Sequence, residues 1–132
     1  MIDQYIRESF DRQGLMKTIG AKILYIEEGK ITIGCSLLDS LTQQHGFFHA
    51  GVLISIVDTA CGYAALTMMR ENSEVLTVEF KINFLKPAIS QTIFAIGKVL
   101  QSGKTITFCE GIVTDDKQEK VFAKMTATMI KK

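Results

Sequence analysis

The spacing of apolar residues changes from helical to alternating within the first part of the chain. Over residues 2–13 apolar side chains recur every three or four positions, and Gly14 follows as a stop signal, so a short amphipathic helix is predicted there. Over residues 18–38 apolar and polar residues alternate on both sides of the sequence Glu-Glu-Gly-Lys, which predicts two strands joined by a tight turn. The chain is therefore expected to begin with a helix and a hairpin.

A second helix is predicted in the middle of the chain, and it is hydrophobic nearly all round. Residues 39–48 are first polar and then aromatic, with Gly46 among them, which indicates a loop. Residues 49–70 follow, and their apolar side chains would cover almost every face of a helix, as is typical of a buried helix rather than an amphipathic one. Asp58 is the only acidic residue in this segment.

The rest of the chain has the pattern of strands separated by short turns. Strand-like segments cover residues 77–84, 93–101, 105–114 and 120–130. Pro87, Gly103 and Asp115 mark the turns between them, and consecutive strands with short turns predict an antiparallel meander. We therefore predict a single α+β domain over residues 1–132, in which an antiparallel sheet wraps around one long buried helix and a short helix precedes them.

Composition and charge exclude several classes of function. With 47% hydrophobic and 22% charged residues, and a formal net charge of +1, the chain resembles an ordinary globular domain without the basic excess of a nucleic-acid binder. No stretch reaches the roughly 20 consecutive apolar residues of a membrane span, and no secretory signal is visible. Three cysteines without CxxC spacing predict no disulfide framework, no metal site and a reducing, cytoplasmic setting.

Asp58 is the first candidate for chemistry. A carboxylate inside a buried helix costs several kcal/mol unless a partner stabilises it. One interpretation is structural, with a salt bridge or a hydrogen bond from a Ser or Thr. The other is functional, in which Asp58 acts as a general base or a nucleophile in a desolvated site.

The loop before the long helix is the second candidate. Gln43, His45, Gly46, His49 and Gly51 fall within nine positions of one another. The first turn of a helix carries unpaired N–H donors and the positive end of the helix dipole, and glycine lets a ligand approach them closely. This arrangement suits the oxyanion that develops on a reacting carbonyl. A histidine there can equally be a helix cap.

The two candidates are separated along one helix. Ala50 and Asp58 are eight residues apart, which corresponds to ~12 Å of helix, so a single carbonyl cannot contact both within one chain. If both act in one reaction, a second chain must supply one of them, and two antiparallel copies of the helix across a twofold axis would form two equivalent sites. Gly62 and its small neighbours would permit close approach of such a copy, although this surface could instead pack on the chain's own sheet.

The sequence QQHGFFHAGVLISIVDTACGYAA at residues 43–65 resembles the hot-dog-fold acyl-CoA thioesterases of the phenylacetate-degradation (PaaI) type. The sequence TVEFKINFLKPA at residues 77–88 resembles the strand that follows in that family, with its closing Pro-Ala. The resemblance implies a hot-dog fold and hydrolysis of an acyl-CoA thioester to an acid and CoA. It also implies an acyl-CoA substrate with no separate cofactor, and a homodimer or, as a pair of dimers, a homotetramer.

The resemblance assigns roles to the residues around the helix entrance. Asp58 matches the family's general base or nucleophile, and Gly51 matches the second glycine of its His-Gly-Gly motif. Ala50 replaces the first glycine, but it keeps the backbone N–H that polarises the thioester carbonyl in the family. The substitution bears on rate and substrate choice more than on fold.

The resemblance gives three further residues supporting roles. His49 matches the histidine of the motif, which orients the loop. Gln43 stands where the family often has Asn, which positions the carbonyl or the attacking water, and Gln offers the same hydrogen bonds on a longer side chain. Thr77 stands near a family Ser or Thr that helps to place water.

Two questions stay open at the level of sequence. Several aromatic and methionine side chains belong either to an acyl pocket or to the core, namely Phe47, Phe48, Tyr63, Met68 and Met69. Hydrolysis is the predicted activity, and the alternatives are a hydratase or dehydratase on the same fold and an acyl-CoA sensor without turnover. Fold alone does not decide between them.

Overall fold

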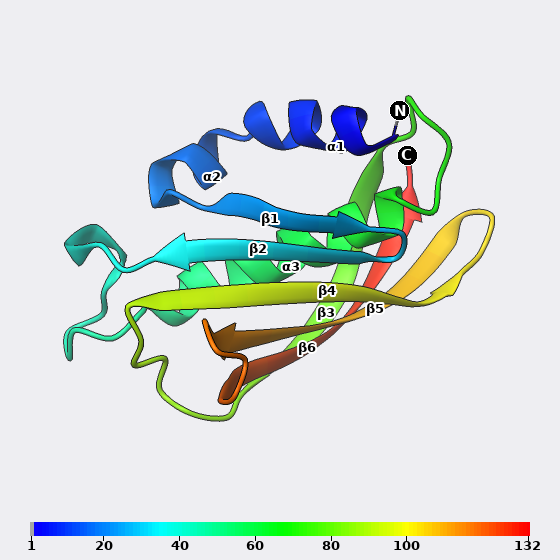
Figure 1. Ribbon diagram of the computed structural model, residues 1–132. Coiled ribbons are helices and arrows are strands. Elements are labelled where there is room, and N and C mark those ends of the chain that lie inside the picture. The colour runs from blue at the N-terminus through cyan, green and yellow to red at the C-terminus, as the bar shows by residue number, and fades with distance from the viewer. Residues whose placement is uncertain (1) are drawn as a thin grey trace.

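The computed structural model, which describes residues 2–132, consists of one six-stranded antiparallel sheet curled around a long helix, with two short helices at the N-terminus (Figure 1). The helices are α1 (Ile2–Asp11), α2 (Gly14–Ile19) and α3 (Ala50–Leu66), and a 3-10 turn, η1, covers Asp39–Leu41. The strands are β1 (Lys22–Glu27), β2 (Lys30–Ser36), β3 (Val75–Phe84), β4 (Thr92–Ser102), β5 (Ile106–Asp115) and β6 (Val121–Lys131).

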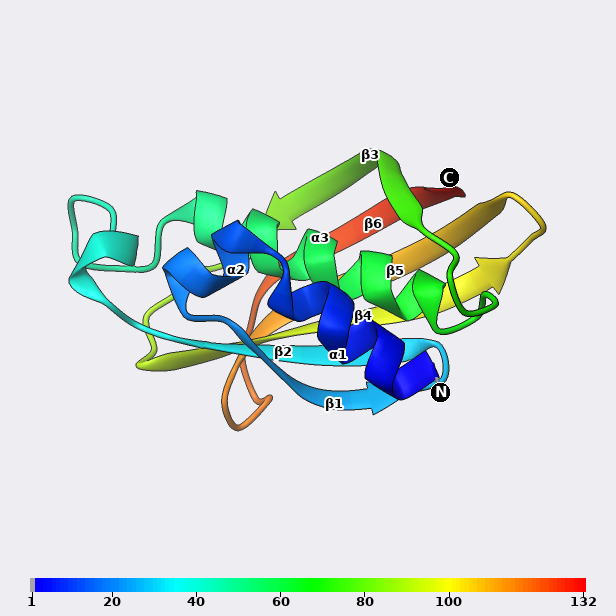
Figure 2. The same cartoon turned by 90° about the horizontal axis from the view of Figure 1, so that it is seen from above.

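The order of strands across the sheet is β1-β2-β4-β5-β6-β3. The predicted meander is correct for β4, β5 and β6, but it is wrong for β3, which pairs with β6 at the far edge instead of with β4. Helix α3 carries the chain from β2 to that edge, and the loop after β3 returns to the middle of the sheet (Figure 2). Alternation within a strand fixes which face is buried but not which strand lies beside it.

Helix α3 lies in the concave face of the sheet, as predicted. Ile56, Val57 and Ala60 are fully buried there. The approach is close enough to require glycine in the facing strands: a Cβ at Gly97 would lie 2.4 Å from the backbone carbonyl carbon of Ala60. Another at Gly111 would lie 2.5 Å from Val57 Cγ2. Burial of the apolar residues of α3 against the sheet is therefore what holds the fold together.

One strip of α3 stays half-exposed, and we call it the open strip. Its residues recur at helical spacing and are mostly small or polar, namely Gly51, Ile54, Ser55, Asp58, Thr59 and Gly62. Two of its hydroxyls bond back to the helix, because Ser55 donates to the carbonyl of Gly51 at 2.8 Å and Thr59 donates to that of Ser55 at 2.7 Å. The open strip is therefore only partly covered by this chain.

The N-terminal segment differs in detail from the prediction. Gly14 does not end the helical region, because α2 follows and Gly20 ends it in the left-handed conformation at φ 74°. The first strand consequently begins at Lys22. Helix α1 crosses beside the C-terminal half of α3 (Figure 2), and it buries Ile6 and Phe10. This packing makes α1 a wall of the site described next.

Candidate active site

Asp58 lies in the middle of α3 on the open strip. The hydroxyl of Thr77, in β3, donates a hydrogen bond of 2.7 Å to its Oδ1 atom. Partial burial raises the pKa of Asp58 above its ordinary value, and the hydrogen bond from Thr77 acts in the opposite direction by stabilising the ionised form. Asp58 is thus a partly desolvated carboxylate held in place by one neutral donor.

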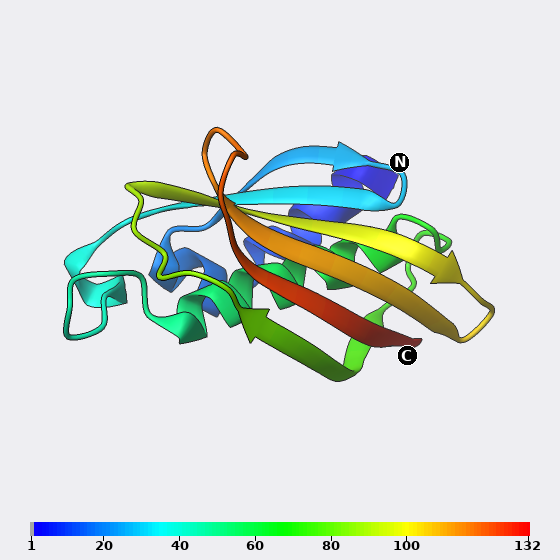
Figure 3. The same ribbon diagram turned by 90° about the horizontal axis from the view of Figure 1, so that it is seen from below.

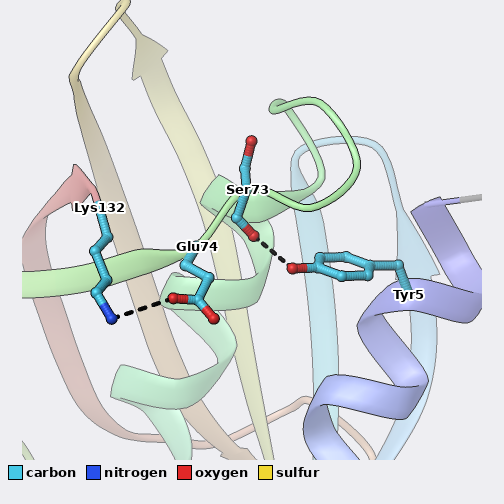
Figure 4. Close-up of polar contacts among 4 residues, drawn as sticks. All are labelled: Tyr5, Ser73, Glu74 and Lys132. Atoms are coloured by element: carbon cyan, nitrogen blue, oxygen red, sulfur yellow. Dashed lines mark hydrogen bonds and ion pairs between the residues drawn. The ribbon is translucent and has the colours of Figure 1, made fainter.

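A cavity of about 430 Å³ opens beside Asp58. It lies between α1, α3 and the beginning of β3, and its wall includes Tyr5, Ser9, Gln13, Tyr63, Leu66 and Met129. Polar contacts fix its rim (Figure 4): the Tyr5 hydroxyl donates to the carbonyl of Ser73 at 2.7 Å, and the Lys132 ammonium lies 3.4 Å from the Glu74 carboxylate. Helix α1 and the C-terminus are therefore both tied to the segment before β3.

A second cavity, of about 510 Å³, lies at the entrance of α3. Gln43 and its neighbours in the loop form one side, and residues 84–88, from the last residue of β3 onward, form the other. The side-chain oxygen of Gln43 accepts hydrogen bonds from the backbone N–H groups of His45, at 2.6 Å, and Phe47, at 3.2 Å. Gln43 therefore shapes its own loop, which brings Phe47 and His49 to the cavity wall.

His49 is the N-cap of α3. Its Nδ1 atom accepts the backbone N–H of Gly51 at 2.8 Å, and its carbonyl accepts that of Val52 at 3.0 Å. A Cβ at Gly51 would lie 3.0 Å from the same Nδ1 atom, so glycine at this position avoids a close contact with the imidazole ring. Among the described residues, the N–H of Ala50 has no partner, and Ala50 lines the second cavity. Ala50, rather than Gly51, therefore offers the free donor at this helix end.

The residues that the sequence singled out fall into two groups. Asp58 and Thr77 are in contact at the first cavity, whereas Gln43, His49 and Ala50 surround the second. The aromatic candidates divide in the same way, because Tyr63 lines the first cavity and Phe47 and Phe48 line the second. Met68 lies apart, exposed beside Gly29. One chain therefore contains two candidate half-sites, in separate cavities.

Sequence reasoning missed the side chains that the N-terminal helices contribute. Tyr5 and Ser9 of α1, and Gln13 at the N-cap of α2, reach the cavity because α1 folds back onto α3. Nothing in the local pattern of α1 identifies the element against which it packs. The amphipathic spacing identified only which face of α1 is buried.

The three cysteines lie in settings that disfavour the reactive thiolate form. All are free and buried, and burial raises the pKa of Cys35, Cys61 and Cys109, the last to about 11. Residues 2–132 contain no cluster of three acidic, His or Cys side chains that could hold a metal ion. The same part of the chain has no helix long and apolar enough to cross a bilayer.

Comparison with known proteins supports the fold and shows the family of this chain. The family profile described as the thioesterase superfamily matches residues 45–122. A thioesterase family protein from Silicibacter pomeroyi has a structure with a TM-score of 0.94 and 41% identity, over 99% of this chain and 98% of that one. The Escherichia coli PaaI protein from the phenylacetic acid degradation operon has the same fold, with a TM-score of 0.89 at 21% identity over 99% and 93% of the two chains.

Relatives found by sequence similarity belong to the same class of protein. A candidate esterase of Saccharolobus solfataricus is 32% identical over 96 residues, which are 73% of this chain and 68% of the relative. A 1,4-dihydroxy-2-naphthoyl-CoA hydrolase of Listeria monocytogenes is 24% identical over 119 residues, which are 90% of this chain and 97% of the relative. The chain thus belongs to the thioesterase superfamily, with the hot-dog fold of its PaaI-type members.

Proposed function

We propose that the protein hydrolyses an acyl-CoA thioester to a free acid and CoA at a site shared by two copies of the chain. Asp58 of one copy acts as general base or nucleophile, and the N–H of Ala50 in the other copy polarises the carbonyl. The observation that carries this proposal is the separation of the two half-sites. Each contains one part of a thioester hydrolase, and ~12 Å of helix lies between them.

The sheet edge supports assembly of such a pair. Strand β3 is one of the two edge strands of the sheet (Figure 3), and it exposes large apolar side chains on either side of a β-bulge at Val78, including Leu76, Val78 and Phe80. An exposed edge strand presents unpaired backbone groups that can pair with another strand. Antiparallel pairing of β3 with β3 of a second copy would bring the open strips of the two α3 helices toward each other. The entrance of each α3 would then approach the Asp58 of the other.

The chemistry follows from these positions. The thioester carbonyl accepts the Ala50 N–H at the positive end of α3, where negative charge on oxygen is stabilised. With Asp58 as general base, the carboxylate takes a proton from water while the water oxygen attacks the carbonyl carbon. The tetrahedral intermediate then breaks its carbon–sulfur bond, and the departing CoA thiolate takes the proton from Asp58. Thr77 holds the carboxylate in place throughout.

The substrate class is supported by the comparisons and by the cavity. The Listeria relative is a hydrolase of an aromatic acyl-CoA, and this supports an acyl-CoA as the substrate of this chain. The cavity beside Asp58 has the size of a small-molecule pocket. It would receive the acyl group while CoA extends toward the second cavity of the other copy.

A thiol-release assay over a panel of acyl-CoAs tests the proposal. We expect release of CoA from at least one member, and loss of release in Asp58→Asn with the fold retained by circular dichroism. Asp116→Asn, in the exposed turn after β5, is the matched control and should keep full activity. Full activity in Asp58→Asn would contradict the assigned role. Binding of an acyl-CoA without release from any substrate would favour a sensor, and hydration of crotonyl-CoA would favour a hydratase.

A further inference from the structure

The Thr77 hydroxyl contacts a methionine sulfur as well as Asp58. Its Oγ1 atom lies 2.7 Å from Asp58 Oδ1 and 3.4 Å from the Sδ atom of Met129, and both contacts have hydrogen-bond geometry. Met129 is directly opposite Thr77 in the β3–β6 pair, is fully buried and lines the first cavity. A hydroxyl carries only one proton, so Thr77 donates to one of these two acceptors at a time. The structure therefore gives the Thr77 proton two alternative positions.

These two positions suit the two protonation states of Asp58. While Asp58 is ionised, its carboxylate oxygen is much the stronger acceptor, and Thr77 donates to it. Once Asp58 holds a proton on Oδ1, its own O–H can donate to the Thr77 oxygen, and Thr77 needs another acceptor for its proton. Among the described residues, the Met129 sulfur is the other acceptor within reach of this hydroxyl. A thioether accepts but does not donate, so it can serve in this state without competing for the Thr77 oxygen.

We propose that Met129 is a positioning residue for the reaction, because its sulfur accepts the Thr77 proton while Asp58 carries the proton taken from water. This inference rests on the proposed function, with Asp58 as general base. The proton on Asp58 stays there until the departing CoA thiolate takes it, and Thr77 keeps its own proton throughout. Only the direction of the hydrogen bond between Asp58 and Thr77 reverses, and it returns when Asp58 is ionised again.

The sulfur acts on the protonated form of Asp58 only. Without it, the Thr77 hydroxyl could accept from protonated Asp58 only by leaving its own proton unpaired in a partly buried place, which costs free energy. Burial already raises the pKa of Asp58, and the sulfur acts in the same direction, because it stabilises the state in which the proton is bound. Met129 therefore makes Asp58 a stronger base.

Other titratable groups lie around the catalytic carboxylate, and none of them contacts the sulfur through a hydrogen bond. Glu74 and Lys132 form an ion pair with each other at the rim. Cys61, on α3, is buried, and burial raises the pKa of its thiol, which keeps it neutral. The two phenols that line the cavity are hydrogen-bonded within the chain, namely those of Tyr5 and Tyr63. A change at the sulfur therefore reaches the carboxylate through the Thr77 hydroxyl.

The acid limb of the kcat/KM profile tests the inference. Met129→Leu removes the sulfur and roughly conserves the volume of the side chain. We expect its limb to lie about half a pH unit below that of the wild type, because the pKa of Asp58 falls when the protonated form loses its support. The weaker base should also lower kcat above the limb by about twofold, with KM unchanged.

Met125→Leu is the matched control. Met125 lies on the same strand and is also fully buried, but it does not line the cavity. Its substitution should leave the limb at the wild-type pH. A limb that stays in place in Met129→Leu, or that moves to higher pH, would overturn the inference.

The Thr77→Val background separates the hydrogen bond from a change in burial. Without the hydroxyl the sulfur has no proton to accept, so adding Met129→Leu to Thr77→Val should leave the limb of Thr77→Val where it is. A shift of the same size with and without the hydroxyl would show that the sulfur acts through packing alone, and it would overturn the inference.

Failure of the proposed function gives a different result. If no acyl-CoA is hydrolysed, hydrolysis is contradicted, and a carbon-13 NMR titration of the Asp58 carboxyl in the wild type and in Met129→Leu then tests the alternative acceptor. A lower pKa in the variant would support it, and an equal or higher pKa would overturn it. Should Met129→Leu not fold, Met129→Ile carries the same comparison, since isoleucine suits a buried strand.

Discussion

At the scale of single residues, two opposing effects set the behaviour of Asp58. Burial makes the carboxylate harder to ionise, and the Thr77 hydroxyl makes it easier. The hydrogen bond from Thr77 favours the ionised carboxylate, which is the form that acts as a base. Burial raises the proton affinity of the carboxylate, which makes it a stronger base. The position of Thr77 on β3 therefore bears directly on the pH range of activity.

Thr77→Val removes the hydrogen bond with little change in shape. Because the hydrogen bond stabilises the ionised form, its loss raises the pKa of Asp58 further, and activity should then be lost at a higher pH as the solution is acidified. The acid limb of the kcat/KM profile is expected to move to higher pH than in the wild type. A limb that stays in place or moves to lower pH would show that Thr77 does not control this carboxylate.

Gly62 gives a second prediction at the residue scale. Gly62→Ala should raise the free energy of unfolding of a single chain by about 1 kcal/mol, because the new methyl group meets no atom of the same chain closer than 4.0 Å and the helix gains propensity. The same methyl narrows the cavity beside Asp58, so kcat/KM for bulky acyl-CoAs should fall. Thermal unfolding and the thiol-release assay measure the two effects. A variant that is destabilised, or equally active on every acyl group, would contradict the role given to Gly62.

At the scale of elements, the packing of α3 on the sheet depends on glycine in the facing strands. Gly97→Ala would place a methyl group 2.4 Å from the backbone of Ala60, so α3 must move away from β4. We expect a loss of about 1–3 kcal/mol in the free energy of unfolding, measured by urea titration. Gly14→Ala, at the start of α2 with nothing near its Cβ, is the control and should be close to neutral. Equal stability of the two variants would rule out this contact.

Much of this element structure could be predicted from the sequence. The long apolar helix, the hairpin and the last three strands follow from apolar periodicity, and the resemblance assigns Asp58 to the site. The edge position of β3 could not be predicted, because alternation does not specify the neighbouring strand. Helix α2 could not be predicted either, because its six residues are too few to show a helical pattern. Gly20, which caps it, is equally typical of a turn. Ser9 of α1 and Gln13 at the N-cap of α2 could not be predicted as cavity residues, because their place depends on how these helices pack against α3.

At the scale of the whole molecule, the account requires two copies of the chain. Val78→Lys, on the edge strand β3, should give a monomer by light scattering, because it replaces an exposed apolar side chain by a charged one that must stay in water. Its activity should fall by at least about a hundredfold, the effect of losing an oxyanion donor. Leu100→Lys on β4 is the control, since Val78 and Leu100 are each 56% exposed. A monomeric Val78→Lys variant with full activity would contradict the shared site.

The most direct test of the shared site is complementation between two inactive variants. Asp58→Asn removes the carboxylate, and Ala50→Pro removes the free N–H. Proline is tolerated at this first helical position, and His49 before it has φ −64° and ψ 138°, as a residue preceding proline prefers. Each variant alone should be inactive but folded.

A purified heterodimer of the two variants should recover activity. One of its two sites combines both substitutions, but the other combines an intact Asp58 with an intact Ala50 N–H from the opposite copy. The account therefore predicts about half of the wild-type activity per dimer. A heterodimer as inactive as its two parents would show that the carboxylate and the donor do not meet across the interface.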